Sequence, residues 1–204
     1  MESENAEQSM LVPEEMYISS GTEIGTQQKR SDMEPFIAKV RTDGLYLIDL
    51  KEADRRIREA GKLLARYDPQ QVLAVAVRQY AQKPITLLAE VTGIRAMPGR
   101  FLPGTLTNPH CNTYTEPDIL LLTDPIGDYQ ALKEAITVGI PVVALCDTNN
   151  QTKYIDWVVP VNNKGRKSLA LTYWLLAREI LKNRGDIKDY DEFEYRVDDF
   201  EAEL

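Results

Sequence analysis

The sequence predicts an α/β fold in which helices flank a mainly parallel sheet. Three short runs are almost entirely apolar: residues 72–77 (VLAVAV), 119–122 (ILLL) and 141–146 (PVVALC). Strands buried on both faces have this continuous apolar pattern. Amphipathic segments separate the runs, and such alternation is typical of a parallel sheet covered by helices. The chain has 204 residues, 43% of them apolar, which is enough to bury such a core within one domain.

Four amphipathic segments repeat apolar residues at intervals of three and four, so we predict a helix in each. The first follows residue 50 and continues to Tyr67, where Asp68-Pro69 ends it, because the residue before a proline disfavours helix. The others cover about 78–91, 129–138 and 167–183. Pro84 is expected at a helix start or a kink, and Gly185 ends the last helix.

Shorter apolar segments predict further strands at 45–50 (LYLIDL), at 157–159 and, after an early turn bracketed by Gly21 and Gly25, at 36–40. Residues 93–117 differ, because seven glycines and prolines in this stretch are too many for regular structure. We therefore expect a long loop there, and a loop of that length in a compact domain is usually a working surface.

The acidic residues are concentrated at the two ends of the chain. The whole protein has 24 basic and 32 acidic side chains and a net charge of −8. Residues 1–16 contain five acidic residues and no basic one, and residues 186–204 contain nine acidic and two basic ones. The remaining 17–185 therefore carry 22 basic and 18 acidic side chains, a charge of +4. We predict one domain at 17–185 between an acidic N-terminal tail and an acidic C-terminal tail.

Two observations bear on the location of the protein. No apolar run reaches the length of a membrane-spanning helix, and residues 1–10 lack the basic and apolar parts of a signal peptide. Two cysteines, Cys111 and Cys146, are too few for a disulfide framework, so a reducing cytoplasm is expected.

The motifs of nucleotide-binding enzymes are missing, although the predicted fold often carries them. No strand is followed by G-x-G-x-x-G or by a phosphate-binding G-x-x-x-x-G-K-[ST] loop. The sole histidine, His110, excludes a two-histidine metal site, and His110-Cys111 is expected to be an ordinary loop pair. Asp124, Asp128 and Asp147 follow strands and could bind magnesium. We favour turn and helix capping instead, so no catalytic residue, metal site or cofactor is predicted.

Basic residues gather in the predicted loops, where they could bind phosphate groups. They are Lys29, Arg30, Arg95, Arg100, Lys164, Arg166 and Lys167. The last three surround Gly165 at a predicted helix start, where free N–H groups and the helix dipole attract anions. Lysine and arginine position a protein on phosphates without reading bases. The alternative is ordinary solvated loop charge.

Each acidic tail contains a possible helix. In the C-terminal tail, the spacing of three and four predicts one apolar helical stripe, formed by Tyr190, Phe193, Val197, Phe200 and Leu204. An acidic amphipathic helix of this kind can dock on a basic partner or on its own domain. The alternative is a solvated tail. Glu14 and Glu15, which follow Pro13, favour the first turn of a short helix, with an irregular tail as the alternative.

Several spaced segments together resemble one family. Residues 117–141 (PDILLLTDPIGDYQALKEAITVGIP) match its signature at Pro117, the triplet 120–122, Asp124, Asp128, Leu132, Glu134, Gly139 and Ile140. Other matches lie within 33–50 (Phe36, Arg41, Asp43, Gly44 and Leu45) and at 99–105, 144–147, 162–165 and 174–179. Over about residues 10–185 the sequence resembles the family of the second protein of the small ribosomal subunit, in its archaeal form. The eukaryotic counterpart is the SA or laminin-receptor-like protein.

The resemblance implies a three-layer, flavodoxin-like fold with a five-stranded, mainly parallel sheet. It also implies a non-catalytic structural role in the cytoplasmic small subunit, near the junction of head and body. The implied partners are ribosomal RNA and neighbouring ribosomal proteins, with no membrane and no small-molecule substrate. Within the family pattern, the Gly99-Arg100 loop and Asn163-Lys164-Gly165 are the expected RNA-contacting segments.

The chain departs from the family at two points. The first signature is usually G-x-H-x-G, and here residues 21–25 (GTEIG) place Glu23 at the histidine position. The helical-hairpin insertion of bacterial members is also missing. On the residues alone two other functions stay open: a nucleotide- or metabolite-binding enzyme on the doubly wound sheet, and a protein-recruitment module acting through the acidic tails.

Overall fold

A five-stranded parallel sheet forms the centre of the molecule. The computed structural model describes residues 10–203. The strands are β3 (Val72–Ala76), β4 (Arg95–Pro98), β5 (Ile119–Leu122), β6 (Val142–Cys146) and β7 (Trp157–Pro160). Their spatial order is β4-β3-β5-β6-β7, and every neighbouring pair is parallel. The second strand therefore lies outside the first, which is the flavodoxin-like order, and the winding reverses between β3 and β5.

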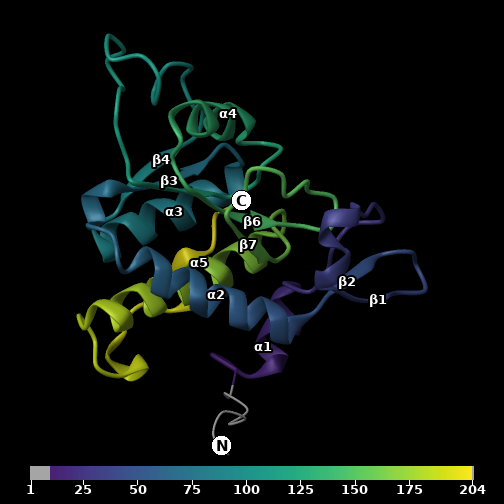
Figure 1. Cartoon of the computed structure of the whole chain (residues 1–204). Coiled ribbons are helices and arrows are strands. Elements are labelled where there is room, and N and C mark those ends of the chain that lie inside the picture. Colours follow the sequence, from purple (N-terminus) through teal and green to yellow (C-terminus); the bar gives the residue numbers. More distant parts are fainter. Residues whose placement is uncertain (1–9, 204) are drawn as a thin grey trace, which may run out of the picture.

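Helices cover both faces of this sheet. Figure 1 shows α4 (Tyr129–Val138) on one side, and α2 (Leu50–Leu64) and α5 (Arg166–Arg184) on the other. The latter side also includes α3 (Gln79–Thr92), which packs against α5. The predicted α/β three-layer architecture is confirmed.

Residues of each strand alternate between the two faces, as the geometry of a strand requires. In β3, Val72, Ala74 and Ala76 belong to the core under α2, α3 and α5, while Leu73 and Val75 belong to the core under α4. Because both faces are covered, all five residues of the strand are buried. This double burial explains the continuous apolar runs in the sequence.

The segment before the parallel sheet forms a separate hairpin. Strands β1 (Ile37–Val40) and β2 (Tyr46–Ile48) pair antiparallel and project from the body (Figure 1). Both predicted strands are thus present, but neither joins the main sheet. The predicted strand at 45–50 ends early because Asp49 caps α2, its carboxylate accepting hydrogen bonds from the N–H groups of Lys51 and Glu52.

The prediction of a loop throughout 93–117 is wrong at one point, since residues 95–98 form β4. This strand is the edge of the sheet and pairs only with β3. An edge strand tolerates a proline such as Pro98 because one side of its backbone makes no ladder hydrogen bonds. Residues 99–117 do form the expected irregular loop.

The N-terminal segment is packed on the domain from residue 10 onward. The short helix predicted after Pro13 is confirmed as α1 (Glu14–Ser20), with Glu14 and Glu15 in its first turn. Gly21 ends it at a φ of 71°, a conformation that glycine adopts without strain. Gly25 allows the backbone at residue 25 to pack closely against Thr148, because a Cβ at this position would lie 2.4 Å from Thr148 Cγ2. Residues 1–9 lie outside the described part of the chain, and the domain boundary at residue 17 stays a prediction.

The C-terminal segment does not form the predicted amphipathic helix. It contains two 3-10 turns, at Tyr190–Glu192 and Val197–Phe200, and their tight geometry breaks the helical stripe. The apolar side chains still pack on the domain: Phe200 is fully buried, and Phe193 and Val197 contact the same core. Leu204 lies outside the described residues. Docking on the chain's own domain was one of the outcomes left open for this segment, beside docking on a basic partner and a solvated tail.

Within residues 10–203, no helix has both the length and the apolar character needed to cross a membrane.

Candidate nucleic-acid interface

Six of the seven basic residues predicted to contact RNA lie where the strands of the sheet have their carboxyl ends, here called the carboxyl edge. Lys164, Arg166 and Lys167 follow β7. Arg100 follows β4, and the preceding Gly99 donates a hydrogen bond from its N–H to the carbonyl of Ala76 at the end of β3, at 2.8 Å.

Residues 28–30 reach the same edge through a contact with the segment after β6. The N–H of Arg30 donates to the carbonyl of Thr148 at 2.9 Å, and the Thr148 hydroxyl donates to the carbonyl of Gln28 at 3.0 Å. Lys29 lies between these two anchored positions. The fold thus gathers basic residues that are more than 130 positions apart in the chain.

Three of these cations are open to solvent and free of acidic partners. Arg30, Arg100 and Lys167 are exposed, and none forms an ion pair with another residue of the range 10–203. An exposed cation without an acidic partner can bind a phosphate group without first breaking an ion pair.

The other three cations at the carboxyl edge form ion pairs with carboxylates of the same chain. Lys29 pairs with Glu34 at 2.7 Å, Lys164 with Asp147 at 2.6 Å, and Arg166 with Glu201 at 2.6 Å. Asp147 is only 1% exposed, whereas the Lys164 side chain is 32% exposed, so the pair joins a surface cation to a buried carboxylate. Glu201 belongs to the acidic C-terminal segment, which therefore lies against the basic carboxyl edge.

Arg95 is the exception among the seven. It is the first residue of β4, so it lies at the opposite edge of the sheet, where its guanidinium donates to the carbonyl of Gln70 and to the hydroxyl of Thr115. The structure does not bring Arg95 together with the other six.

The loop that carries Arg100 is anchored by a buried carboxylate. Glu134 of α4 accepts hydrogen bonds from the N–H groups of Gly104 and Leu106, at 2.7 and 2.9 Å. Burial alone would raise the pKa of this carboxyl, but these bonds and those from Gln130 and Thr107 hold it below its usual value. Phe101 and Leu106 add apolar anchors in the core under α4. The loop is thus held in place without regular secondary structure.

The protein's own side chains occupy the place where doubly wound folds bind their ligands, between the carboxyl ends of β3 and β5. Arg78, which follows β3, forms an ion pair of 2.5 Å with Asp124, which follows β5. The other oxygen of Asp124 accepts hydrogen bonds from the amides of Asn150 and Asn163. The sequence prediction missed Arg78; its position directly after a buried strand was the available signal.

The aspartates at this edge accept backbone hydrogen bonds. The predicted turn capping is present, since Asp124 accepts from the N–H of Ile126, but the side chain of Asp128 does not cap α4, whose N-cap residue it is. Asp128 accepts hydrogen bonds from the N–H groups of Val77, Thr123 and Asp124, at 2.8 to 3.0 Å. Burial raises the pKa of Asp128 to about 6, although these hydrogen bonds act in the opposite direction. Asp147 accepts from the N–H of Thr148 at 2.6 Å. Residues 10–203 contain no group of three or more His, Cys, Asp or Glu side chains that could hold a metal ion.

The two cysteines and the histidine have ordinary surroundings. His110 is exposed, and its backbone N–H donates to the side chain of Asn108. Cys111 lies beside the hydroxyl of Thr113 at 3.2 Å, and this contact lowers the pKa of the thiol. Cys146 is fully buried in β6, as expected for a cysteine that acts as a small apolar residue.

The start of α5 has the features expected of an anion-binding helix end. Gly165 is the N-cap, and no side chain caps the first turn. Asn162 fixes the segment that leads into the helix, because its side-chain oxygen accepts hydrogen bonds from the N–H groups of Lys164 and Gly165, both at 3.0 Å. The positive end of the dipole of this 19-residue helix is therefore presented beside Arg166 and Lys167.

Comparison with known proteins identifies the family of this chain. The family model described as ribosomal protein S2 matches residues 17–116 and 109–183, from within α1 to the next-to-last residue of α5. The chain belongs to the ribosomal protein S2 family. Among curated relatives of the S2 family, the small ribosomal subunit protein uS2 of Thermoplasma volcanium is 58% identical over 97% of this chain and 100% of its own length.

Two further S2 relatives extend this result. The small ribosomal subunit protein uS2 of Thermoplasma acidophilum is 57% identical over 97% of this chain and 100% of its own length. That of Haloquadratum walsbyi is 55% identical over 97% of this chain, which covers 69% of the relative's length. The family resemblance noted from spaced signature residues is thereby confirmed.

Proposed function

We propose that this S2-family chain is a structural, non-catalytic constituent of the small ribosomal subunit in the cytoplasm, with ribosomal RNA and neighbouring ribosomal proteins as its partners. The observation that carries the proposal is the 58% identity, over the full length of the relative, to a protein named for its place in the small subunit. The test is sedimentation: the tagged chain expressed in its native cell should migrate with small subunits at low magnesium, and a chain found only in the free-protein fractions would contradict the proposal.

We propose further that RNA contacts the carboxyl edge. The open cations Arg30, Arg100 and Lys167 support this, together with the uncapped start of α5. Each cation that neutralises a phosphate adds to the affinity and to its dependence on salt. Arg95 is excluded from this surface because it lies at the other edge of the sheet.

Charge reversal tests the RNA surface directly. The variant R30E/R100E/K167E should bind small-subunit ribosomal RNA at least tenfold more weakly than the native chain, with a shallower salt dependence. The control is K62E/R66E, because Lys62 at the end of α2 and Arg66 just after it are exposed and lie at the amino-end edge; it reverses two charges instead of three. Equal losses per reversed charge in the two variants would show that the binding is non-specific charge attraction rather than contact at the carboxyl edge.

The alternative of a nucleotide- or metabolite-binding enzyme rests only on the architecture of the sheet. Against it stands the ion pair of Arg78 with Asp124, which occupies the place between β3 and β5. A thermal-shift screen with nucleotides checks this alternative, since a bound nucleotide would stabilise the native state in a saturable manner. We expect no saturable shift.

A further inference from the structure

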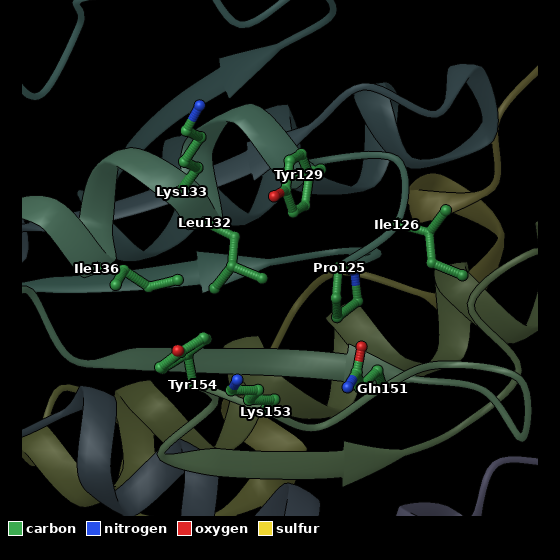
Figure 2. A pocket seen from close by; sticks show the side chains of 9 residues that line it. All are labelled: Pro125, Ile126, Tyr129, Leu132, Lys133, Ile136, Gln151, Lys153 and Tyr154. Carbon is green, nitrogen blue, oxygen red and sulfur yellow. The ribbon is translucent and has the colours of Figure 1, made fainter.

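A hollow on the surface between α4 and the segment after β6 has no role in the RNA-binding proposal. Its volume is about 360 Å³, and Figure 2 shows its two walls facing each other. Helix α4 supplies Tyr129, Leu132 and Ile136, and the opposite wall carries Lys153 and Tyr154. We call this hollow the α4 groove.

The α4 groove exposes large apolar side chains that a folded protein usually buries. Ile126 is 56% exposed, Tyr129 61%, Ile136 40% and Tyr154 56%. Single exposed apolar residues are common, but a cluster of four around one hollow is typical of an interaction site. Tyrosine is also enriched in protein interfaces, because its ring buries much area at a low entropic cost.

The groove carries positive charge and no negative charge on its lining. Lys133 and Lys153 flank it, neither has an ion-pair partner among residues 10–203, and no aspartate or glutamate belongs to the lining. The ammonium of Lys153 lies 4.8 Å from the centre of the Tyr154 ring. A partner that brings carboxylates to these lysines gains electrostatic complementarity as it buries its apolar side chains.

The backbone holds Tyr154 in an unusual conformation. Its φ of 67° is the only positive value of a non-glycine residue in the range 10–203. Such a conformation is strained for a residue with a side chain and is commonly found at functional sites. Here it places an exposed aromatic ring on the wall of the groove opposite α4 (Figure 2).

We propose that the α4 groove binds an acidic, amphipathic segment of another protein, a segment that buries two or three large apolar side chains and carries carboxylates beside Lys133 and Lys153. The observations favour a protein segment over single-stranded RNA, because the isoleucines give aliphatic surface on which bases do not stack, whereas helix-in-groove recognition uses such surface. None of the six cations assigned to the carboxyl edge lines this groove. If the chain is a ribosomal protein, a neighbouring protein of the particle would supply the segment.

A photo-crosslink in the native particle tests the proposal. A benzophenone amino acid replaces Ile136, and small subunits that contain the tagged chain are purified and irradiated. The expected product joins residue 136 to a protein segment with a net negative charge and at least two large apolar residues. Its yield should fall at least fivefold with K133E/K153E, but not with the control K51E/K62E, which changes two exposed lysines of α2. A crosslink to RNA, to a basic segment or to a second copy of this chain would overturn the proposal, as would the absence of any crosslink in particles that contain the protein.

A binding measurement on the free protein separates this proposal from the ribosomal one. The probe is a synthetic 16-residue peptide of net charge −6, with leucine and phenylalanine on one helical face. Its binding, followed by fluorescence anisotropy, should weaken at least fivefold with I126S/I136S and with K133E/K153E. A scrambled peptide of the same composition should bind at least fivefold more weakly than the ordered one. Equal binding of the two peptides, or equal binding to native protein and variants, would overturn the groove proposal even if the chain sediments with small subunits.

Discussion

The guanidinium of Arg166 and the carboxylate of Glu201 form an ion pair of 2.6 Å between the first residue of α5 and the acidic C-terminal segment. The same guanidinium donates to the carbonyl of Ala202 at 3.3 Å. Nearby, Lys83 pairs with Glu203 at 3.3 Å. The Glu201 carboxylate thus pairs with Arg166, one of the cations at the carboxyl edge, where we propose that RNA binds.

Glu201→Gln should therefore increase RNA affinity. The substitution frees Arg166 for a phosphate while it leaves the shape of the segment unchanged, so we expect a threefold to tenfold tighter complex with small-subunit ribosomal RNA and a steeper salt dependence. Filter binding over a salt series measures both quantities. Glu203→Gln is the matched control, because its partner Lys83 is not among the proposed RNA contacts, and its affinity should stay within twofold of the native value. A weaker complex in Glu201→Gln would mean that Arg166 does not meet phosphate.

Phe200→Ala should destabilise the protein by about 3 kcal/mol, the lower end of the range for a buried phenylalanine. Phe200 is fully buried in the core that includes α3 and α5, although it lies only four residues from the C-terminus. Urea unfolding followed by circular dichroism measures the change. The control Tyr80→Ala removes a ring that is 40% exposed and should cost less than about 1 kcal/mol. Equal stability of Phe200→Ala and the native chain would show that the C-terminal segment does not pack on the domain in solution.

Ionisation of Asp128 should lower the free energy of unfolding as pH rises from about 4 to about 6. Burial raises the pKa of this carboxyl from 3.8 to about 6, so the folded state binds its proton more tightly than the unfolded state does. The resulting stabilisation is complete below the unfolded pKa and is lost as pH increases through the folded pKa, with a total of about 3 kcal/mol. Carbon NMR of the Asp128 carboxyl should show a midpoint near 6.

The variant Asp128→Asn isolates this pH dependence. It cannot titrate, so its stability should lose the component that the native chain shows between pH 4 and 6. Its amide nitrogen also cannot accept the hydrogen bonds of the oxygen it replaces, which costs about 1–3 kcal/mol at low pH. A native-like pH profile in Asp128→Asn would assign the titration to another group.

Glu134→Gln should loosen the loop that carries Arg100. One of the two carboxylate oxygens is replaced by a donor, so the N–H of Gly104 or of Leu106 loses its buried acceptor, at a cost of about 1–3 kcal/mol. Amide hydrogen exchange at these two positions should be at least tenfold faster. Glu90→Gln, on the exposed face of α3, should change neither rate. Unchanged exchange in Glu134→Gln would show that Phe101 and Leu106 anchor the loop without the carboxylate.

Elements that depend on local pattern were predicted well from the sequence. The helix at 129–138 has the predicted bounds, and the buried strands at 72–76, 119–122 and 142–146 lie within or at the predicted apolar runs. Burial on both faces forces these strands to be apolar throughout, so the signal is strong. Strand β4 was missed because an edge position accepts Pro98 and half-buried side chains, which leaves no apolar signature.

The grouping of the basic residues could not be read from their positions along the chain. Arg95 and Arg100 are five residues apart, yet β4 separates them to opposite edges of the sheet. Arg30 and Lys167 are far apart in sequence. Lys167 follows the carboxyl end of β7, and the hydrogen bond from the N–H of Arg30 to the carbonyl of Thr148 brings Arg30 to the same edge. Residue spacing carries no information about which edge of a sheet a loop reaches, because the position and direction of the intervening strand decide it.

The sequence by itself determined the α/β class, the family, and the division of a net charge of −8 into a basic domain and two acidic ends. Only the tertiary structure decided that the C-terminal acidic segment packs on the domain and that Glu201 pairs with Arg166. Charge composition is additive along the chain, so it can be counted from residues. Ion pairing depends on distances of a few ångströms between segments, and these exist only once the strands have been ordered and the buried Phe200 has fixed the end of the chain against α5.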